Sequence, residues 1–77
     1  MARGNRTIDQ AFGEVLKRLR KRAGLSQEEL AHRCDLHRTY VSMLERGLKS
    51  PSLGVVVRLA EELGVDAWEM VKEVGKS

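Results

Sequence analysis

The sequence predicts an all-α fold, a compact five-helix bundle in a single domain, residues 1–77, with its core at about 8–74. Apolar residues recur at intervals of three and four, which is the spacing that buries one face of a helix. Capping signals precede several of these stretches, and glycines follow them. No stretch between turn signals alternates apolar and polar residues in the way that indicates a strand.

The first predicted helix follows Thr7 and stops at Gly24. Thr7 and Gln10 have the spacing of a capping box, in which each side chain binds the other residue's free backbone N–H. The expected buried stripe is Phe12, Val15, Leu16, Leu19 and Ala23. The expected solvated cations are Lys17, Arg18, Arg20, Lys21 and Arg22.

A second helix is predicted after Ser26, which forms another capping box with Glu29. Its expected inner face is Leu30, Ala31 and Cys34. Residues 35–37 then connect it to a third helix, which runs from Arg38 to about Arg46.

These two short helices are separated by a tight turn, so they can cross steeply if the residue at their contact is small. Ala31 lies at that contact. The wedge between the helices is expected to hold Leu30, Leu36, Val41 and Leu44. This arrangement is a helix-turn-helix over residues 27–46, whose second helix can lie in a DNA major groove.

Two further helices complete the predicted bundle. Either Ser50 or Ser52 caps the fourth helix, which Gly64 closes, and Asp66 with Glu69 opens the fifth. The expected stripe of the fourth helix is Leu53, Val56, Val57, Ala60 and Leu63. The fifth helix carries Ala67, Met70, Val71 and Val74.

The net charge of +3 is unevenly distributed along the chain. Residues 1–25 contain seven Lys/Arg against two Asp/Glu, whereas residues 51–77 contain three against five. A basic front and an acidic back indicate a polyanion partner on one face, or only a solvated charged surface.

Composition and spacing exclude several classes of protein. The longest apolar run, Val55 to Val57, cannot span a membrane, and the first residues lack the apolar segment of a secretory signal. We therefore expect a cytoplasmic location and no membrane partner. The single cysteine excludes an internal disulfide. His32, Cys34 and His37 could suggest a metal site, but His32 and Cys34 face different sides of their helix and Cys34 is expected inside, so we expect no metal and no cofactor. We also expect no catalytic residues and no small-molecule ligand, because no nucleophile and base stand at a recognisable spacing and the chain is small for a pocket.

The stretch LSQEELAHRCDLHRTYVSMLERGLKSPSL resembles the Cro/repressor-type (XRE) helix-turn-helix transcriptional regulators of bacteria and phages. The matching features are the SQEELA opening, Val41 and Leu44, the ERG ending, the PSL start of the next helix and the LAEELGV that closes it. The resemblance covers about residues 12–71, and RTYVS followed by ERG looks closest in wording to the controller proteins of restriction-modification systems. It implies a lambda-repressor-like DNA-binding domain.

Two positions depart from the family pattern. Asp35 stands where the family usually has Gly, at a turn position that often needs positive φ, which Asp tolerates at some energetic cost. His37 stands where Ser or Thr often caps the recognition helix, and His is a weaker cap.

The polar side of the third helix would face the groove. The expected base-reading residues are Arg38, Thr39, Ser42 and Met43. The guanidinium of Arg38 can bind guanine O6 and N7 together, and Thr39 and Met43 can touch thymine methyls. The expected contacts to the DNA backbone are Ser26, Gln27, His37, Tyr40, Arg46 and Lys49. Among these, Gln27 resembles the backbone-contacting glutamine of the family.

Each of these residues has a plainer interpretation as well. Met43 can simply cover the edge of the domain, and Tyr40 can be mainly a packing residue. Arg46 can pair locally with Glu45 or another neighbour, and Arg38 can be a surface charge.

Trp68 predicts a dimer interface, since related sequences usually carry a polar residue at this position. Val71 lies on the same helix, and Val55 and Leu59 of the fourth helix are expected to extend the patch. The alternative is that Trp68 folds back over its own first helix. A two-fold dimer predicts a palindromic DNA site.

The leading hypothesis is therefore a sequence-specific regulator of transcription that binds double-stranded DNA as a homodimer and inserts its third helix into the major groove. An antitoxin-like protein that binds a partner protein and autoregulates through DNA is the alternative, disfavoured because few residues lie outside the predicted core. A non-specific nucleic-acid module is disfavoured by the near-neutral residues 26–50.

Overall fold

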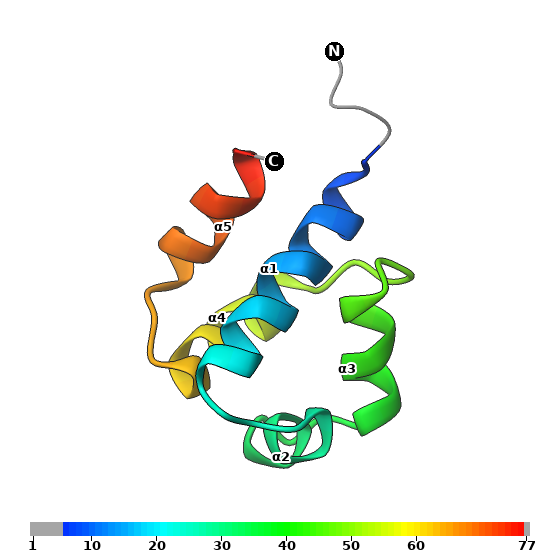
Figure 1. The fold of residues 1–77 in the computed structure, drawn as a ribbon, viewed down its shortest axis with the longest axis vertical. Helices are drawn as coiled ribbons and strands as arrows, with labels where there is room; N and C mark the ends of the chain where they lie inside the picture. The colour runs from blue at the N-terminus through cyan, green and yellow to red at the C-terminus, as the bar shows by residue number, and fades with distance from the viewer. Residues whose placement is uncertain (1–5, 77) are drawn as a thin grey trace.

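The computed structural model describes residues 6–76, and these form five α-helices and no strand (Figure 1). The helices are α1 (Ile8–Arg22), α2 (Gln27–Arg33), α3 (Arg38–Glu45), α4 (Leu53–Leu63) and α5 (Ala67–Gly75). The predicted all-α, five-helix fold is confirmed. The outermost parts of the predicted domain, residues 1–5 and 77, lie outside the described residues.

The first two helices begin at the predicted capping boxes. The side chains of Thr7 and Ser26 accept hydrogen bonds at 3.0 Å from the backbone N–H groups of Gln10 and Glu29. The side chains of Gln10 and Glu29 accept in return from the backbone N–H groups of Thr7 and Ser26. A side-chain cap of this kind is worth about 1 kcal/mol, so the starts of α1 and α2 are set locally.

The loop between α3 and α4 uses its two serines differently. Ser52 caps α4, because its hydroxyl accepts from the backbone N–H of Val55 at 3.1 Å. Ser50 instead donates to the carboxylate of Asp9 in α1. The second hydrogen bond ties the loop that leaves α3 to the first turn of α1.

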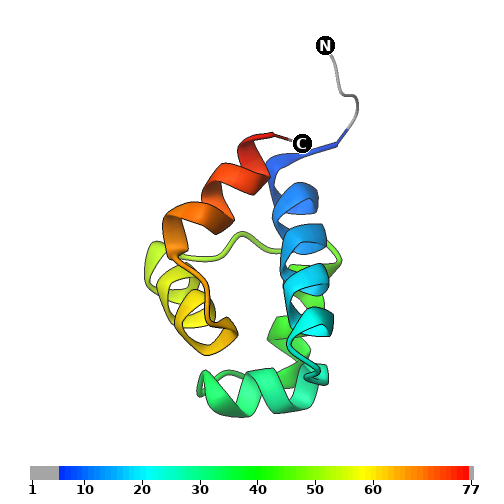
Figure 2. The same cartoon turned by 60° about the vertical axis from the view of Figure 1, so that its left-hand side comes forward.

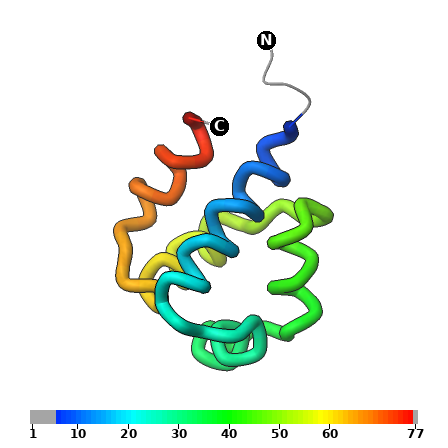
Figure 3. The backbone as a smooth tube through the Cα atoms, viewed as in Figure 1, coloured from blue at the N-terminus to red at the C-terminus, as the bar shows by residue number. Residues whose placement is uncertain are grey.

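α1 lies between α3 on one side and α5 on the other (Figures 1 and 3). α2 packs against α3 and α4, and α4 packs against α5, so the five helices close around a common centre. Turning the molecule shows α2 across the end of the fold where α1 finishes (Figure 2). No helix of the described range is long and apolar enough to cross a membrane.

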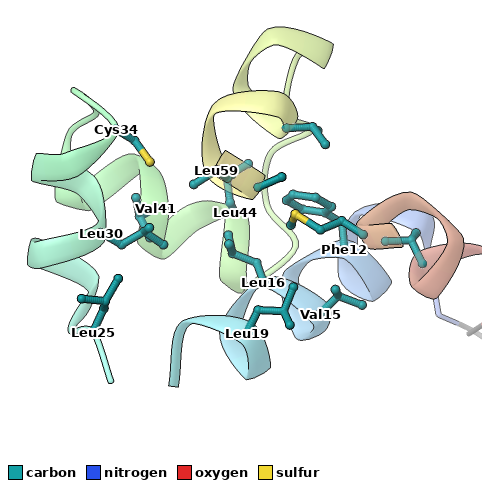
Figure 4. Packing of buried hydrophobic residues seen from close by; sticks show 14 of the residues in the cluster. Phe12, Val15, Leu16, Leu19, Leu25, Leu30, Cys34, Val41, Leu44 and Leu59 are labelled. Atoms are coloured by element: carbon teal, nitrogen blue, oxygen red, sulfur yellow. The ribbon is translucent and has the colours of Figure 1, made fainter. Parts of the chain in front are cut away.

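A continuous hydrophobic core fills the space between the helices (Figure 4). Leu16, Leu30, Leu44, Leu59 and Met70 have no exposed surface, and together they come from all five helices. Burying one leucine completely contributes roughly 1.5–3 kcal/mol relative to leaving it exposed. The core therefore depends on every helix, and it fixes α3 against both α1 and α2.

The buried face of α4 differs from the predicted stripe. Val56, Leu59 and Ala60 are buried, whereas Leu53 and Val57 are 76% and 41% exposed. Apolar residues occupy most positions around this helix, so periodicity alone did not select a face. Packing against α5 and α2 selects it.

Candidate nucleic-acid interface

The turn between α2 and α3 has the backbone conformation that the sequence predicts. Asp35 has a φ of 57°, the one positive value at a non-glycine position among residues 6–76. Hydrogen bonds close the turn, because the N–H of Leu36 donates to the carbonyl of Ala31 at 2.8 Å and that of Asp35 to His32 at 3.2 Å. This connection fixes the direction in which α3 leaves α2.

α3 is held by its apolar face. Val41 and Leu44 are fully buried in the core where α3 packs against α1 and α2 (Figure 4). These contacts hold α2 and α3 together as the predicted helix-turn-helix and pack α3 against α1, and they leave the opposite face of α3 uncovered.

The uncovered face of α3 carries the four predicted base-reading residues. Arg38 and Thr39 in the first turn are exposed, and Ser42 and Met43 are half-buried. Within residues 6–76 none of these four side chains forms a hydrogen bond or an ion pair. The structure thus brings them together on one face and leaves their polar groups available to a ligand. The half-buried position of Met43 also agrees with the alternative interpretation, in which this side chain only covers the edge of the domain.

The predicted backbone-contacting residues lie around α3 in different environments. The exposed ones are Ser26, His37, Arg46 and Lys49. His37 precedes α3, and its side chain makes no capping hydrogen bond, as expected for a weak cap. Tyr40 is half-buried and packs against the core, so its ring has a packing role. Arg46 forms no ion pair within the described range, because the carboxylate of Glu45 binds elsewhere.

Glu45 is the centre of a buried polar network that the sequence did not predict. Its Oε2 accepts from Arg20 Nε at 2.6 Å, and its Oε1 accepts from Arg20 Nη2 and from Gln27 Nε2, each at 3.0 Å. Arg20 Nη1 also donates to the carbonyl of Leu25 at 2.8 Å. The hydrogen bond to Glu45 raises the pKa of Arg20. This network connects α1, the loop after it, the start of α2 and the end of α3.

The expectation that Arg20 is a solvated cation is wrong. Arg20 is 8% exposed, and it lies one helical turn beyond Leu16 on the side of α1 that contacts α3. The prediction that Ala23 belongs to the buried stripe is also wrong, since Ala23 follows the last residue of α1 and is exposed. Arg20 lies four residues after the buried Leu16, and this spacing was the available signal. The partner is 25 residues away in the chain, so local patterning could not reveal the pair.

Two glycines allow α1 to approach the end of α3 closely. A Cβ on Gly13 would lie 2.5 Å from the carbonyl oxygens of both Leu44 and Glu45. Gly47, which follows α3, has a φ of 74°, and a Cβ there would lie 2.7 Å from a side-chain carbon of Gln10. Only residues without a side chain fit at these two positions.

Comparison with known proteins identifies this arrangement, since residues 16–67 match the Helix-turn-helix family HTH_3. The chain belongs to the XRE family of helix-turn-helix transcriptional regulators. The regulator is 39% identical over 61 residues to control protein C.BamHI of Bacillus amyloliquefaciens, covering 78% of this chain and 75% of the relative. The family and its relatives are DNA-binding regulators of transcription rather than enzymes.

Solved structures show the same fold. The restriction-modification controller protein C.AhdI of Aeromonas hydrophila superposes with a TM-score of 0.78 at 40% identity, covering 80% of the regulator and 94% of that chain. SinR, a master regulator of biofilm formation solved in complex with DNA, superposes with a TM-score of 0.74 at 30% identity, covering 78% and 97%.

An apolar surface of the regulator lies on α5. Trp68 is 61% exposed and Val71 is 54% exposed, so Trp68 does not fold back over α1. Lys72 Nζ lies 5.1 Å from the centroid of the Trp68 ring. A shallow groove of about 210 Å³ begins beside Val71; its apolar lining is Ile8, Phe12, Pro51, Val56, Val71 and Val74.

The placement of Leu59 in a dimer surface is wrong. Leu59 is completely buried in the core, because the buried face of α4 is rotated from the predicted one. Val55 is half-buried and lines a hollow with Cys34 and Leu36, beside the turn of the helix-turn-helix. The exposed apolar residues of α4 are instead Leu53 and Val57, which the predicted stripe had placed inside.

Cys34 has a structural place in the regulator. It is buried in the core, and this burial raises the pKa of its thiol. Within residues 6–76 no three His, Cys, Asp or Glu side chains are grouped so that they could hold a metal ion.

Proposed function

We propose that this regulator acts in the cytoplasm by binding a palindromic operator as a homodimer, with α3 of each protomer in the major groove. The residues that contact base edges are Arg38, Thr39, Ser42 and Met43. The residues that contact the sugar–phosphate backbone are Ser26, Gln27, His37, Tyr40, Arg46 and Lys49.

The observation that carries this proposal is the contrast between the two faces of α3. Val41 and Leu44 anchor the helix in the core, whereas Arg38 and Thr39 are exposed and have no partner in the described part of the chain. Because the backbone of α3 is already fixed by its buried face, only the side chain of Arg38 has to be ordered when its guanidinium binds guanine O6 and N7. The likeness to proteins named control or controller proteins, and to SinR solved with DNA, supports the same role.

The exposed Trp68 and Val71 support the homodimer. Tryptophan is one of the residue types, with tyrosine and arginine, that are enriched at the energetic centre of an interface. A two-fold axis through this surface places the same residues on both sides, and DNA-binding dimers of this kind place their recognition helices about 34 Å apart, one turn of DNA.

The test is to select operators from random duplex DNA and then measure the affinity of Arg38→Ala for the selected site and its single-base variants. We expect a loss of about 1–3 kcal/mol, roughly 5- to 150-fold in affinity, and a relaxed preference at one base pair. Arg33→Ala is the matched control, since Arg33 is an exposed arginine at the end of α2. An equal loss on every sequence would make Arg38 a phosphate contact and contradict base reading.

A further inference from the structure

The hydrogen bond between Gln27 Nε2 and Glu45 Oε1 connects the start of α2 to the end of α3. We infer that Glu45 is a positioning residue for DNA binding, which orients the Gln27 amide so that one N–H faces the protein and the other is presented to a DNA phosphate. This inference rests on the proposed docking of α3 in the major groove.

The chemistry of the amide supports this role. A glutamine side chain ends in an NH₂ with two donors and in a carbonyl oxygen that can only accept. An ionised carboxylate only accepts, so Glu45 selects the orientation in which the nitrogen of Gln27 points toward it. Gln27 is half-buried, and its second N–H has no partner among residues 6–76. An amide free to rotate would also present its oxygen, which repels a phosphate.

A carboxylate near DNA would ordinarily oppose binding, but Arg20 removes this problem. Its guanidinium contacts both oxygens of Glu45, and the Glu45 side chain is only 3% exposed. The pair is neutral as a unit and is shielded from the solvent. Glu45 can therefore align Gln27 without adding negative charge to the surface.

The location of the amide fits a phosphate contact. Glu45 is the last residue of α3, and the exposed cation Arg46 follows it directly. Groups along the edges of a helix in the major groove meet the phosphates of the flanking strands, and these contacts fix the register of the protein. Gln27, bonded to the end of α3, lies at such an edge.

The experiment compares duplexes in which single phosphates of the selected operator are replaced by neutral methylphosphonates. At one position, replacing the phosphate should weaken binding of the wild-type protein about tenfold or more, as expected for the loss of a hydrogen bond to a charged group. The same replacement should not weaken binding of Gln27→Met any further. The double variant Arg20→Met with Glu45→Leu removes the buried pair without leaving an unpaired charge, a replacement that often preserves folding. It should be insensitive at the same position, whereas the control Lys49→Met should keep the wild-type sensitivity there.

Full sensitivity of the double variant at that position would overturn the inference, as would the absence of any position affected by Gln27→Met. If the double variant does not fold, a measurement on the wild-type protein tests the inference instead. In NMR spectra, DNA should shift one of the two Nε2 protons of Gln27 and leave the proton bonded to Glu45 in place; a shift of both or of neither overturns the inference. If the wild-type protein bound no DNA sequence specifically, that result would instead contradict the proposed function.

Discussion

Gly13 of α1 lies against the backbone of Glu45, the last residue of α3. A Cβ on Gly13 would stand 2.5 Å from the carbonyl oxygen of Glu45 and equally close to that of Leu44. Both atoms belong to the backbone, so they can move only if α3 moves. The distance between α1 and α3 is therefore set at this contact.

We expect Gly13→Ala to lower the free energy of unfolding by up to about 2 kcal/mol. Separating the overpacked helices costs about 1–3 kcal/mol, and the better helix propensity of alanine offsets roughly 1 kcal/mol of this. Gly54→Ala in α4 is the control, since the nearest atom to its added Cβ is 3.9 Å away, and it should be neutral or stabilising. Urea denaturation measures both, and a Gly13→Ala protein as stable as Gly54→Ala would contradict the prediction.

The turn residue Asp35 should be replaceable by glycine with a gain in stability. Its φ of 57° lies in the left-handed region, and this conformation costs an L-residue roughly 1–2 kcal/mol. Glycine avoids that cost, but it loses more backbone entropy on folding, which costs about 0.5–1 kcal/mol. Asp35→Gly should therefore raise the free energy of unfolding by up to about 1 kcal/mol, and Asp35→Ala should lower it. Thermal unfolding of the two variants gives the order, and equal melting temperatures would argue against backbone strain.

The cations of α1 should contribute little to DNA binding. Arg18 pairs with Glu73 of α5 at 2.8 Å, on the side of α1 away from α3, and Lys17, Lys21 and Arg22 are exposed. Replacing the latter three with Ala should reduce the slope of log affinity against log salt by about 0.9 at most, the value for one phosphate contact. The control Lys49→Ala should reduce it by about 0.9. A reduction corresponding to three contacts in the α1 variant would mean that α1 faces the DNA.

Trp68→Ala should dissociate the proposed dimer. Removing the exposed ring takes away the largest apolar group of the α5 surface, and loss of such an anchor typically costs 2 kcal/mol or more of association energy, roughly 30-fold in affinity. Sedimentation at micromolar concentration should show a dimer for the wild type and for Leu48→Ala, which removes an equally exposed leucine outside α5. A folded Trp68→Ala protein that remains dimeric would exclude Trp68 as the anchor.

Features encoded within a few neighbouring residues were predictable from the sequence. The capping boxes of α1 and α2 involve residues three apart, and the positive φ of Asp35 follows from its place in a tight turn. The polar face of α3 was predictable for the same reason, because Val41 and Leu44 define the opposite face.

Features that depend on distant partners were not predictable in this way. The burial of Arg20 requires Glu45 from another helix, and the need for Gly13 arises only when α3 packs against α1. The burial of Leu59 depends on which side of the largely apolar α4 meets its neighbours. In each case the local pattern allowed two environments, and tertiary packing selected one.

The separation of the two faces of α3 has an evolutionary consequence. Val41, Leu44 and Glu45 hold the helix in place, while Arg38 and Thr39 take no part in holding it. With α3 docked in the major groove as proposed, substitutions at the outer positions therefore change which operator is preferred without a matching loss of stability. Duplicated copies of such a gene can diverge into regulators that ignore each other's operators while keeping one scaffold, and designers can build mutually independent genetic switches by the same route.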